Sequence, residues 1–234
     1  MVDIPKVITG KSSRNNEPIH IAVNTLGVKK WADQEGKELS EAVEKHTELL
    51  DDLIDLQLKN NTRVLTINLE HQGMIKYLKK YFEKLLGDKR IHENQVRVFI
   101  IGQWYEFDSE ISETFKKLIE ETKEYDKYFL NYCVNYDGQQ EVLGAIRLLT
   151  RKILSDKLKE EELTPEAVKQ SLYTSYFPPP RIIIEPGTKY SGLLLWDSKE
   201  ALIFFTQEPW LLFEKKNYEK AISFYKKQKP KKKD

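Results

Sequence analysis

Apolar residues along the chain follow two alternating patterns. Short, nearly continuous apolar runs, typical of strands that are buried on both faces, occupy 19–24, 63–69, 96–102, 129–136, 181–185 and 201–205. Between these runs, apolar residues recur every three or four positions, as on one face of a helix, over 39–54, 74–85, 111–119 and 142–153. The alternation predicts a single α/β domain with a mostly parallel, six-stranded sheet flanked by helices.

The length of the chain fits one domain with a sizeable core. No internal repeat or linker divides the 234 residues. We expect an N-terminal extension over 1–18, the folded domain over 19–227 and a basic, disordered tail over 228–234. Because no apolar run reaches the length of a membrane span and the N-terminus lacks a signal peptide, we expect a soluble, cytoplasmic protein, with peripheral contact to a membrane as an open alternative.

Charge and cysteine content exclude several kinds of site. Charged residues make up 32% of the chain but nearly cancel to a net charge of +1, which excludes a generally basic nucleic-acid binder. The single cysteine, Cys133, excludes a disulfide framework and a cysteine-rich zinc site, and its apolar surroundings indicate a packed core thiol. The four histidines do not stand at metal-binding spacing, so we expect structural roles for them and no metal site.

Two segments combine the end of a predicted strand with a glycine turn and the start of a helix. In GVKKWA, Gly27 permits a tight turn, and Lys29 and Lys30 add positive charge at a helix N-terminus, which together can hold a diphosphate. A solvated turn with incidental lysines explains these residues equally well. The second segment, VNYDGQQEVLGA over 134–145, is by itself an ordinary connection between a strand and a helix.

Five sequence blocks stand in a characteristic order along the chain. They are HIAVNTLGVKKWA, RVLTINL, VRVFIIG, VNYDGQQEVLGAIRLL and SGLLLWDSKEALIFFTQEPW. Together they resemble the cis-prenyltransferase family, which includes the undecaprenyl and dehydrodolichyl diphosphate synthases. The resemblance implies a reaction in which an allylic diphosphate, assisted by magnesium, loses diphosphate and is attacked by isopentenyl diphosphate. It also implies an aspartate in the first block that helps to handle the metal, and arginines and a serine in a later block that hold isopentenyl diphosphate.

The chain departs from the family pattern at the positions expected to carry this chemistry. Leu26 stands at the position of the aspartate, and a leucine can neither ligate a metal nor carry a proton. Ile183 and Lys189 stand at the two arginine positions of the later block, whereas Ser191 is kept. We therefore predict no catalytic residue and no metal ligand in this chain. The remaining candidates for binding diphosphate are Gly27, Lys29, Lys30, Lys189 and Ser191.

These departures favour a non-catalytic subunit, similar in character to the Nogo-B receptor. Such a subunit would pair with an active homologous cis-prenyltransferase to make long-chain polyprenyl diphosphate, a precursor of glycan-carrier lipids such as dolichol. It would bind no cofactor itself, and the active partner would hold magnesium. One alternative is a divergent, self-sufficient cis-prenyltransferase that condenses isopentenyl diphosphate with an allylic diphosphate. Another is a prenyl-diphosphate binding protein without a partner.

The blocks that match the family best also suggest a surface for pairing, because the resemblance implies a dimer built from the later strands and neighbouring helices. The interface candidates are Asn135, Tyr136, Gly138, Glu141, Trp196 and Trp210. For the two tryptophans, ordinary core positions fit the residue type equally well.

Overall fold

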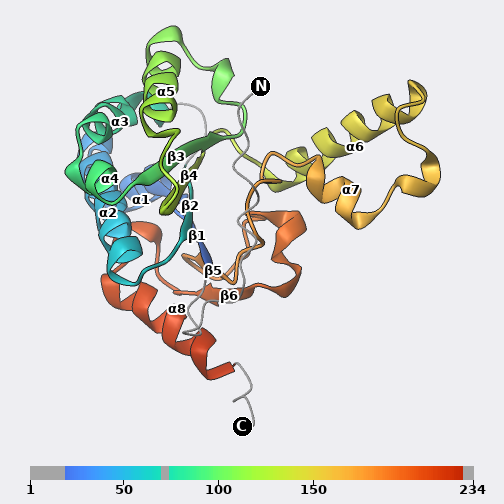
Figure 1. Ribbon diagram of the computed structural model, residues 1–234. Coiled ribbons are helices and arrows are strands. Elements are labelled where there is room, and N and C mark those ends of the chain that lie inside the picture. Colours follow the sequence, from blue (N-terminus) through green and yellow to red (C-terminus); the bar gives the residue numbers. More distant parts are fainter. Residues whose placement is uncertain (1–18, 70–73, 229–234) are drawn as a thin grey trace.

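A parallel sheet forms the centre of the molecule (Figure 1). The computed structural model describes residues 19–69 and 74–228, and within them six strands pair in the order β3-β4-β2-β1-β5-β6, each pair parallel. The strands are β1 (His20–Asn24), β2 (Val64–Asn68), β3 (Val96–Ile101), β4 (Tyr128–Cys133), β5 (Ile182–Glu185) and β6 (Leu202–Phe205). The predicted α/β fold and its six strands are therefore confirmed.

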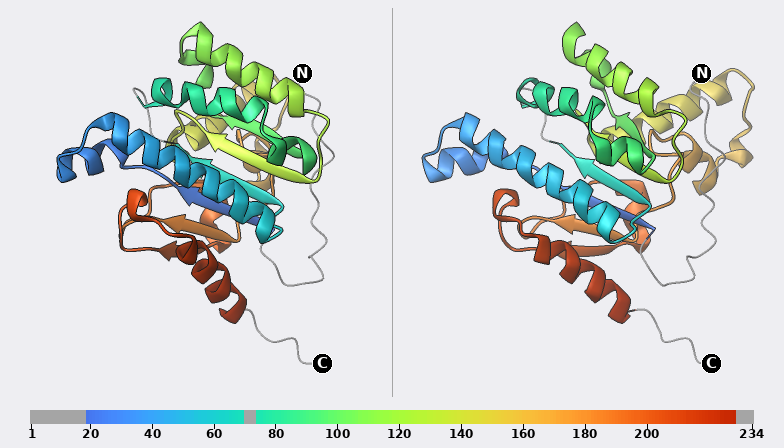
Figure 2. Two further views of the ribbon diagram at one scale, coloured as in Figure 1. Left: turned by 90° about the vertical axis from the view of Figure 1, so that its left-hand side faces the viewer. Right: turned by 60° about the vertical axis from the view of Figure 1, so that its left-hand side comes forward.

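The connections between the strands are helical. The α-helices are α1 (Val28–Glu35), α2 (Leu39–Lys59), α3 (Lys79–Leu86), α4 (Lys89–Glu93), α5 (Ser109–Thr122), α6 (Gly138–Leu154), α7 (Pro165–Gln170) and α8 (Lys215–Gln228). Short 3-10 helices are η1 (Ile75–Leu78), η2 (Trp104–Glu106), η3 (Glu160–Glu162), η4 (Leu195–Glu200) and η5 (Trp210–Leu212). Figure 2 shows α1, α2, α3, α5 and α8 on one side of the sheet, whereas α6 and α7 extend from the other side.

The sheet separates two groups of buried apolar side chains. Successive residues of β1 face opposite groups, as the two-residue period of a strand requires: Ile21 and Val23 lie in the larger group and Ala22 in the smaller. The larger group lies under the helices of the first side. Cys133 is buried in the smaller group, as predicted for a core thiol.

The protruding helix α6 is packed less than its apolar stripe suggests. Ala145 and Leu149 are buried, but Ile146 is 50% and Leu154 is 81% exposed. At the other end of the chain, Gln228 is the last residue of α8 and the first residue of the predicted tail. The predicted extension over 1–18 and the remainder of the tail lie outside the described residues. Within the described ranges, none of the helices combines the length and the apolar character that crossing a membrane requires.

Candidate functional site

The turn between β1 and α1 has the geometry that its sequence predicts. Gly27 precedes α1 and adopts a φ of 97°, in the left-handed region that favours glycine. Its carbonyl oxygen accepts a hydrogen bond from the backbone N–H of Trp31 (2.9 Å), which begins the helix. Lys29 and Lys30 are exposed on the first turn of α1. The turn lies at the carboxyl end of the sheet, where ligands of parallel α/β folds bind.

Polar side chains at the ends of three adjacent strands form a connected group, here called the carboxyl-end network, which consists of Asn24, Asn68, Glu185 and Ser191. Asn24 ends β1 and donates from Nδ2 to Oε2 of Glu185, the last residue of β5 (2.8 Å). Asn24 Oδ1 accepts from Asn68 Nδ2, at the end of β2, and from the backbone N–H of Leu26 (both 3.3 Å). The network thus joins the turn between β1 and α1 to the ends of β2 and β5, the two strands that pair with β1.

Glu185 is the centre of this network. Its side chain has no exposed surface. Its Oε1 accepts hydrogen bonds from the hydroxyl (2.7 Å) and the backbone N–H (3.1 Å) of Ser191. Burial raises the pKa of the Glu185 carboxyl, and the hydrogen bonds from Ser191 and Asn24 oppose that rise. A buried acid therefore lies between the two segments that were predicted to bind diphosphate.

The structure brings some of the predicted diphosphate-binding residues together. The turn at Gly27 and the loop that carries Ser191 are connected through Asn24 and Glu185. Lys189 is exposed on the same loop as Ser191. Asn24 and Glu185 were missed by reasoning from the sequence, although each is a polar residue at the end of a predicted apolar strand, and that signal could have identified them.

The residues present do not fit a magnesium site built from protein ligands. Within the described residues, no three His, Cys, Asp or Glu side chains converge as a metal site requires. Glu185 is a single carboxylate whose oxygens already accept three hydrogen bonds. We therefore derive no step through a metal, and the absence of a cofactor in this chain stays a prediction.

Three histidines in the described part of the chain have structural contacts. His92 bonds through Nδ1 to the Tyr125 hydroxyl (3.0 Å) and through Nε2 to the carbonyl oxygen of Leu86 (2.6 Å). His20, the first residue of β1, bonds through Nδ1 to the carbonyl oxygen of Pro178 (2.6 Å) and through Nε2 to Thr66 Oγ1 (2.8 Å). His46 accepts at Nδ1 from the indole N–H of Trp210 (2.7 Å). Burial lowers the pKa of His20 to about 4 and that of His46 to about 3, so both rings are neutral at physiological pH.

The interface candidates of the NYDGQQE segment make contacts within this chain. The Tyr136 hydroxyl donates to Glu141 Oε2 (2.6 Å), and Glu141 Oε1 accepts from the backbone N–H (3.0 Å) and hydroxyl (2.9 Å) of Thr174. Gly138 lies against the loop of Ser191, because a Cβ atom at this position would be 2.1 Å from the carbonyl oxygen of Gly192. The three interface candidates Tyr136, Gly138 and Glu141 are buried within this chain.

Asn135 is half-buried and donates from Nδ2 to Glu106 Oε2 (3.1 Å). Together with the buried residues, it ties this segment to the interior and to the loop beside the network.

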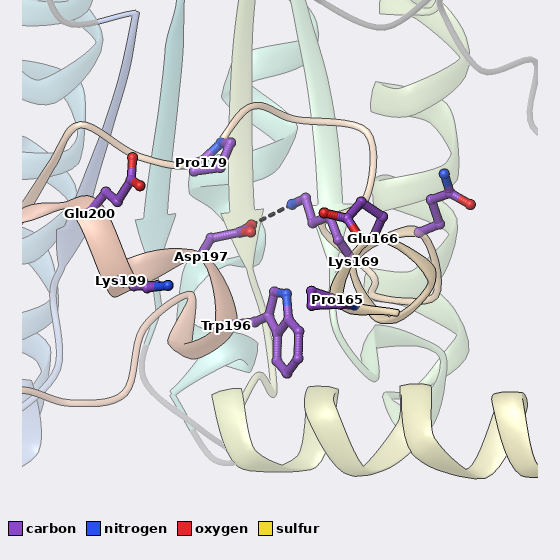
Figure 3. A pocket seen from close by; sticks show the side chains of 9 residues that line it. Pro165, Glu166, Lys169, Pro179, Trp196, Asp197, Lys199 and Glu200 are labelled. Carbon is purple, nitrogen blue, oxygen red and sulfur yellow. Dashed lines mark hydrogen bonds and ion pairs between the residues drawn. The ribbon is translucent and has the colours of Figure 1, made fainter. Parts of the chain in front are cut away.

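The two tryptophan candidates have different environments. Trp210 is 1% exposed and lies in the core of this chain, whereas Trp196 is 37% exposed. Trp196 lines a surface pocket of about 430 Å³ between α7 and η4, next to an ion pair between Lys169 and Asp197 (Figure 3). Pro179 also lines this pocket, and the neighbouring Pro178 bonds to the first residue of β1. The pocket therefore lies on the side of the sheet from which α6 and α7 extend.

A parallel sheet with a glycine turn, a helix N-terminus and lysines at the carboxyl end of a central strand is the arrangement of α/β proteins that bind phosphorylated ligands. The family model described as "Putative undecaprenyl diphosphate synthase" matches residues 26–233. The chain therefore belongs to the cis-prenyltransferase family.

Relatives of nearly the same length support this assignment. A "Tritrans,polycis-undecaprenyl-diphosphate synthase (geranylgeranyl-diphosphate specific)" from Thermoplasma acidophilum is 27% identical over 221 residues, which cover 89% of this chain and 86% of the relative. A protein of the same name from Methanocaldococcus jannaschii is 26% identical over 236 residues, which cover 94% and 84%.

Solved structures share the fold. Lavandulyl diphosphate synthase from Lavandula x intermedia superposes with a TM-score of 0.79 at 19% identity, and 90% of this chain and 96% of that chain are covered. A probable undecaprenyl diphosphate synthase from Campylobacter jejuni gives 0.68 at 18% identity, with 91% and 97% covered.

The expectation of a non-catalytic subunit, inactive on its own, is wrong. It is contradicted by relatives that match most of this chain and are named as synthases. The comparisons also give no support to a likeness to the Nogo-B receptor, to a heteromer or to a role in dolichol synthesis. The error has a physical origin: Leu26 removes a carboxylate from one position, but that observation takes no account of Glu185, which the adjacent strand brings into the same network.

Proposed function

We propose that this protein is a self-sufficient cis-prenyltransferase that condenses isopentenyl diphosphate with an allylic diphosphate. Support comes from the relatives, whose names specify polycis synthases that use geranylgeranyl diphosphate. The structural observation that carries the proposal is the turn at Gly27, which leads from a central parallel strand into the N-terminus of α1. The allylic substrate is accordingly a long-chain allylic diphosphate such as geranylgeranyl diphosphate.

The reaction needs two diphosphate groups to be held close together. C4 of isopentenyl diphosphate attacks C1 of the allylic substrate, and diphosphate leaves with the electron pair of the C1–O bond. The positive end of the α1 helix dipole, together with the charges of Lys29 and Lys30, stabilises the negative charge that develops on this leaving group. Lys189, on the loop beside the network, provides positive charge for the second diphosphate.

The proposal is tested with the purified full chain, geranylgeranyl diphosphate and isotopically labelled isopentenyl diphosphate in a magnesium-containing buffer. We expect elongated products by mass spectrometry, and none when the allylic substrate is left out. Absence of elongation by a folded protein would contradict the proposed function.

The role of the lysines is tested separately, with KM as the readout. Replacing both Lys29 and Lys30 by alanine is expected to raise KM for the allylic diphosphate by about 10-fold or more, because two charge-assisted contacts to a phosphate oxygen are lost. Lys37→Ala provides the matched control, because Lys37 is an exposed lysine just beyond the end of α1 and pairs with Glu41. A double variant with the KM of the control would show that the first turn of α1 does not bind this substrate.

A further inference from the structure

Positive charge is concentrated at the C-terminal end of the chain. The last 20 residues contain nine lysines and two acids, a formal charge of +7, whereas the whole chain carries only +1. The first 214 residues therefore carry a formal charge of −6. Most of the basic segment is the helix α8, which has 14 residues. An asymmetry of this size indicates that this end of the chain meets an anionic partner.

One face of α8 presents this charge to solvent. We call it the α8 stripe, and it consists of Lys216, Lys220, Phe224 and Lys227. Its members follow one another at intervals of three or four positions, so they lie along one face of the helix, and all four are exposed.

The lysines of the α8 stripe are only partly neutralised. Lys216 pairs with Glu214 (2.6 Å), whereas Lys220 and Lys227 form no ion pair with an acid among the described residues. Glu219 is the one acid in α8, and Lys59 already pairs with it (2.6 Å). The stripe therefore keeps positive charge that is available to a partner.

Phe224 adds an apolar ring to the stripe. Its side chain is 46% exposed, and its ring lies against Phe204 of β6 with the ring centroids 6.3 Å apart. Because β6 stands at the edge of the sheet formed by the described residues, α8 lies along the border of the molecule (Figure 2). Lysines around an exposed phenylalanine are typical of helices that lie on anionic membranes, where the lysines contact headgroups and the ring enters between them.

We propose that the α8 stripe binds the surface of a membrane that contains anionic lipids, with Lys220 and Lys227 at the headgroups and Phe224 inserted between them. A membrane is the partner we choose because the allylic substrate and the product carry long hydrocarbon chains that partition into lipid, and this choice rests on the proposed function. The stripe shares no residue with the carboxyl-end network or with the turn at Gly27, so membrane binding does not use the proposed diphosphate site.

The test measures binding of the purified full chain to vesicles by co-sedimentation, in the absence of both diphosphate substrates. One set of vesicles contains equal parts of phosphatidylcholine and phosphatidylglycerol, and the other contains phosphatidylcholine alone. We expect binding to the anionic vesicles that weakens with added salt, and binding to the neutral vesicles that is weaker by about 10-fold or more. Replacing both Lys220 and Lys227 by glutamine should lower the affinity for the anionic vesicles by about 10-fold or more. Phe224→Ser should lower it by about threefold or more, and that loss should persist at high salt.

The matched control replaces Lys89 and Lys117 by glutamine. It removes the same charge from two exposed lysines on α4 and α5, which pack near β3 at the opposite edge of the sheet, and it should bind as the wild type does. Thermal unfolding establishes that each variant is folded.

A wild type that does not bind anionic vesicles would overturn the inference, as would a control that loses as much affinity as the α8 double variant. Binding to single-stranded RNA in preference to vesicles would also overturn it and would indicate a nucleic-acid partner instead. A protein that binds vesicles through α8 but forms no product contradicts only the proposed function. Product formation without vesicle binding contradicts only this inference.

Discussion

The buried pair of His46 and Trp210 should make the protein lose stability in mild acid. The indole N–H of Trp210 donates to His46 Nδ1 at 2.7 Å, so the neutral ring carries its hydrogen on Nε2. A second proton would have to bind Nδ1, where it would face the indole N–H. Burial alone already disfavours the charged ring, and it lowers the pKa of His46 from 6.5 to about 3.

The sign and the size of the effect follow from this pKa. In the unfolded chain the His46 ring takes up a proton below pH 6.5, whereas in the folded protein it stays neutral down to about pH 3. The stabilisation is therefore complete above pH 6.5 and is lost as the pH falls toward 3. Within this window the free energy of unfolding falls by about 1.4 kcal/mol for each unit by which the pH is lowered. Protonation of His46 in the unfolded chain therefore lowers the free energy of unfolding by about 2 kcal/mol at pH 5. His20, with a pKa of about 4, adds a loss of the same sign.

The assay is urea unfolding at several pH values between 7.5 and 5 for the wild type and for His46→Gln. Glutamine cannot titrate, and its side-chain oxygen can still accept from Trp210. We expect the difference in unfolding free energy between the two proteins to shrink by about 2 kcal/mol from pH 7.5 to pH 5. His20 and the carboxylates are present in both proteins, so their contributions cancel in this difference. A difference that stays constant with pH would refute the reasoning about His46.

Two further predictions concern helix α6. Gly138→Ala should destabilise the protein by about 1 to 3 kcal/mol, because the new Cβ would overlap the carbonyl oxygen of Gly192 at 2.1 Å. Gly144→Ala is the control in the same helix, because its new Cβ would lie 3.4 Å from the nearest atom. In thermal unfolding it should be neutral or stabilising by up to about 1 kcal/mol. Equal losses of stability in the two variants would be inconsistent with the contact between Gly138 and Gly192. The predicted heteromer with a homologous subunit stays untested. For the purified chain, we expect a second copy to cover the exposed side chain of Ile146, so Ile146→Glu should lower the mass measured by size exclusion with light scattering, and a monomeric wild type would contradict this self-association.

The strands were predictable because an all-parallel sheet is covered on both faces, so its strands consist of nearly continuous apolar runs in the sequence. The end of β4 was not predictable in this way, because the apolar run continues to Tyr136 whereas the strand stops at Cys133. Asn135 adopts a φ of 47°, which ends the extended conformation. The α6 stripe has the right period for a helix, yet a period does not tell which neighbour covers the apolar face.

The carboxyl-end network depends on strand order, which a single sequence does not specify. Asn24 and Glu185 are 161 residues apart, and they meet because β5 pairs directly with β1. The sequence contains both residues at the ends of predicted strands, but without the β1–β5 pairing neither points to the other. The same limitation affected the inference from Leu26, which took no account of Glu185 because that residue lies on a different strand.

The contact between Gly138 and Gly192 connects the protruding helix to the loop that carries Ser191. Because neither residue has a side chain, the backbones touch directly and nothing between them can be compressed or rearranged. The 17 residues of α6 extend about 25 Å from this contact. Any side chain at position 138 would have to push the start of this long helix away from the loop that carries Ser191, so the missing side chain sets how closely the two segments approach.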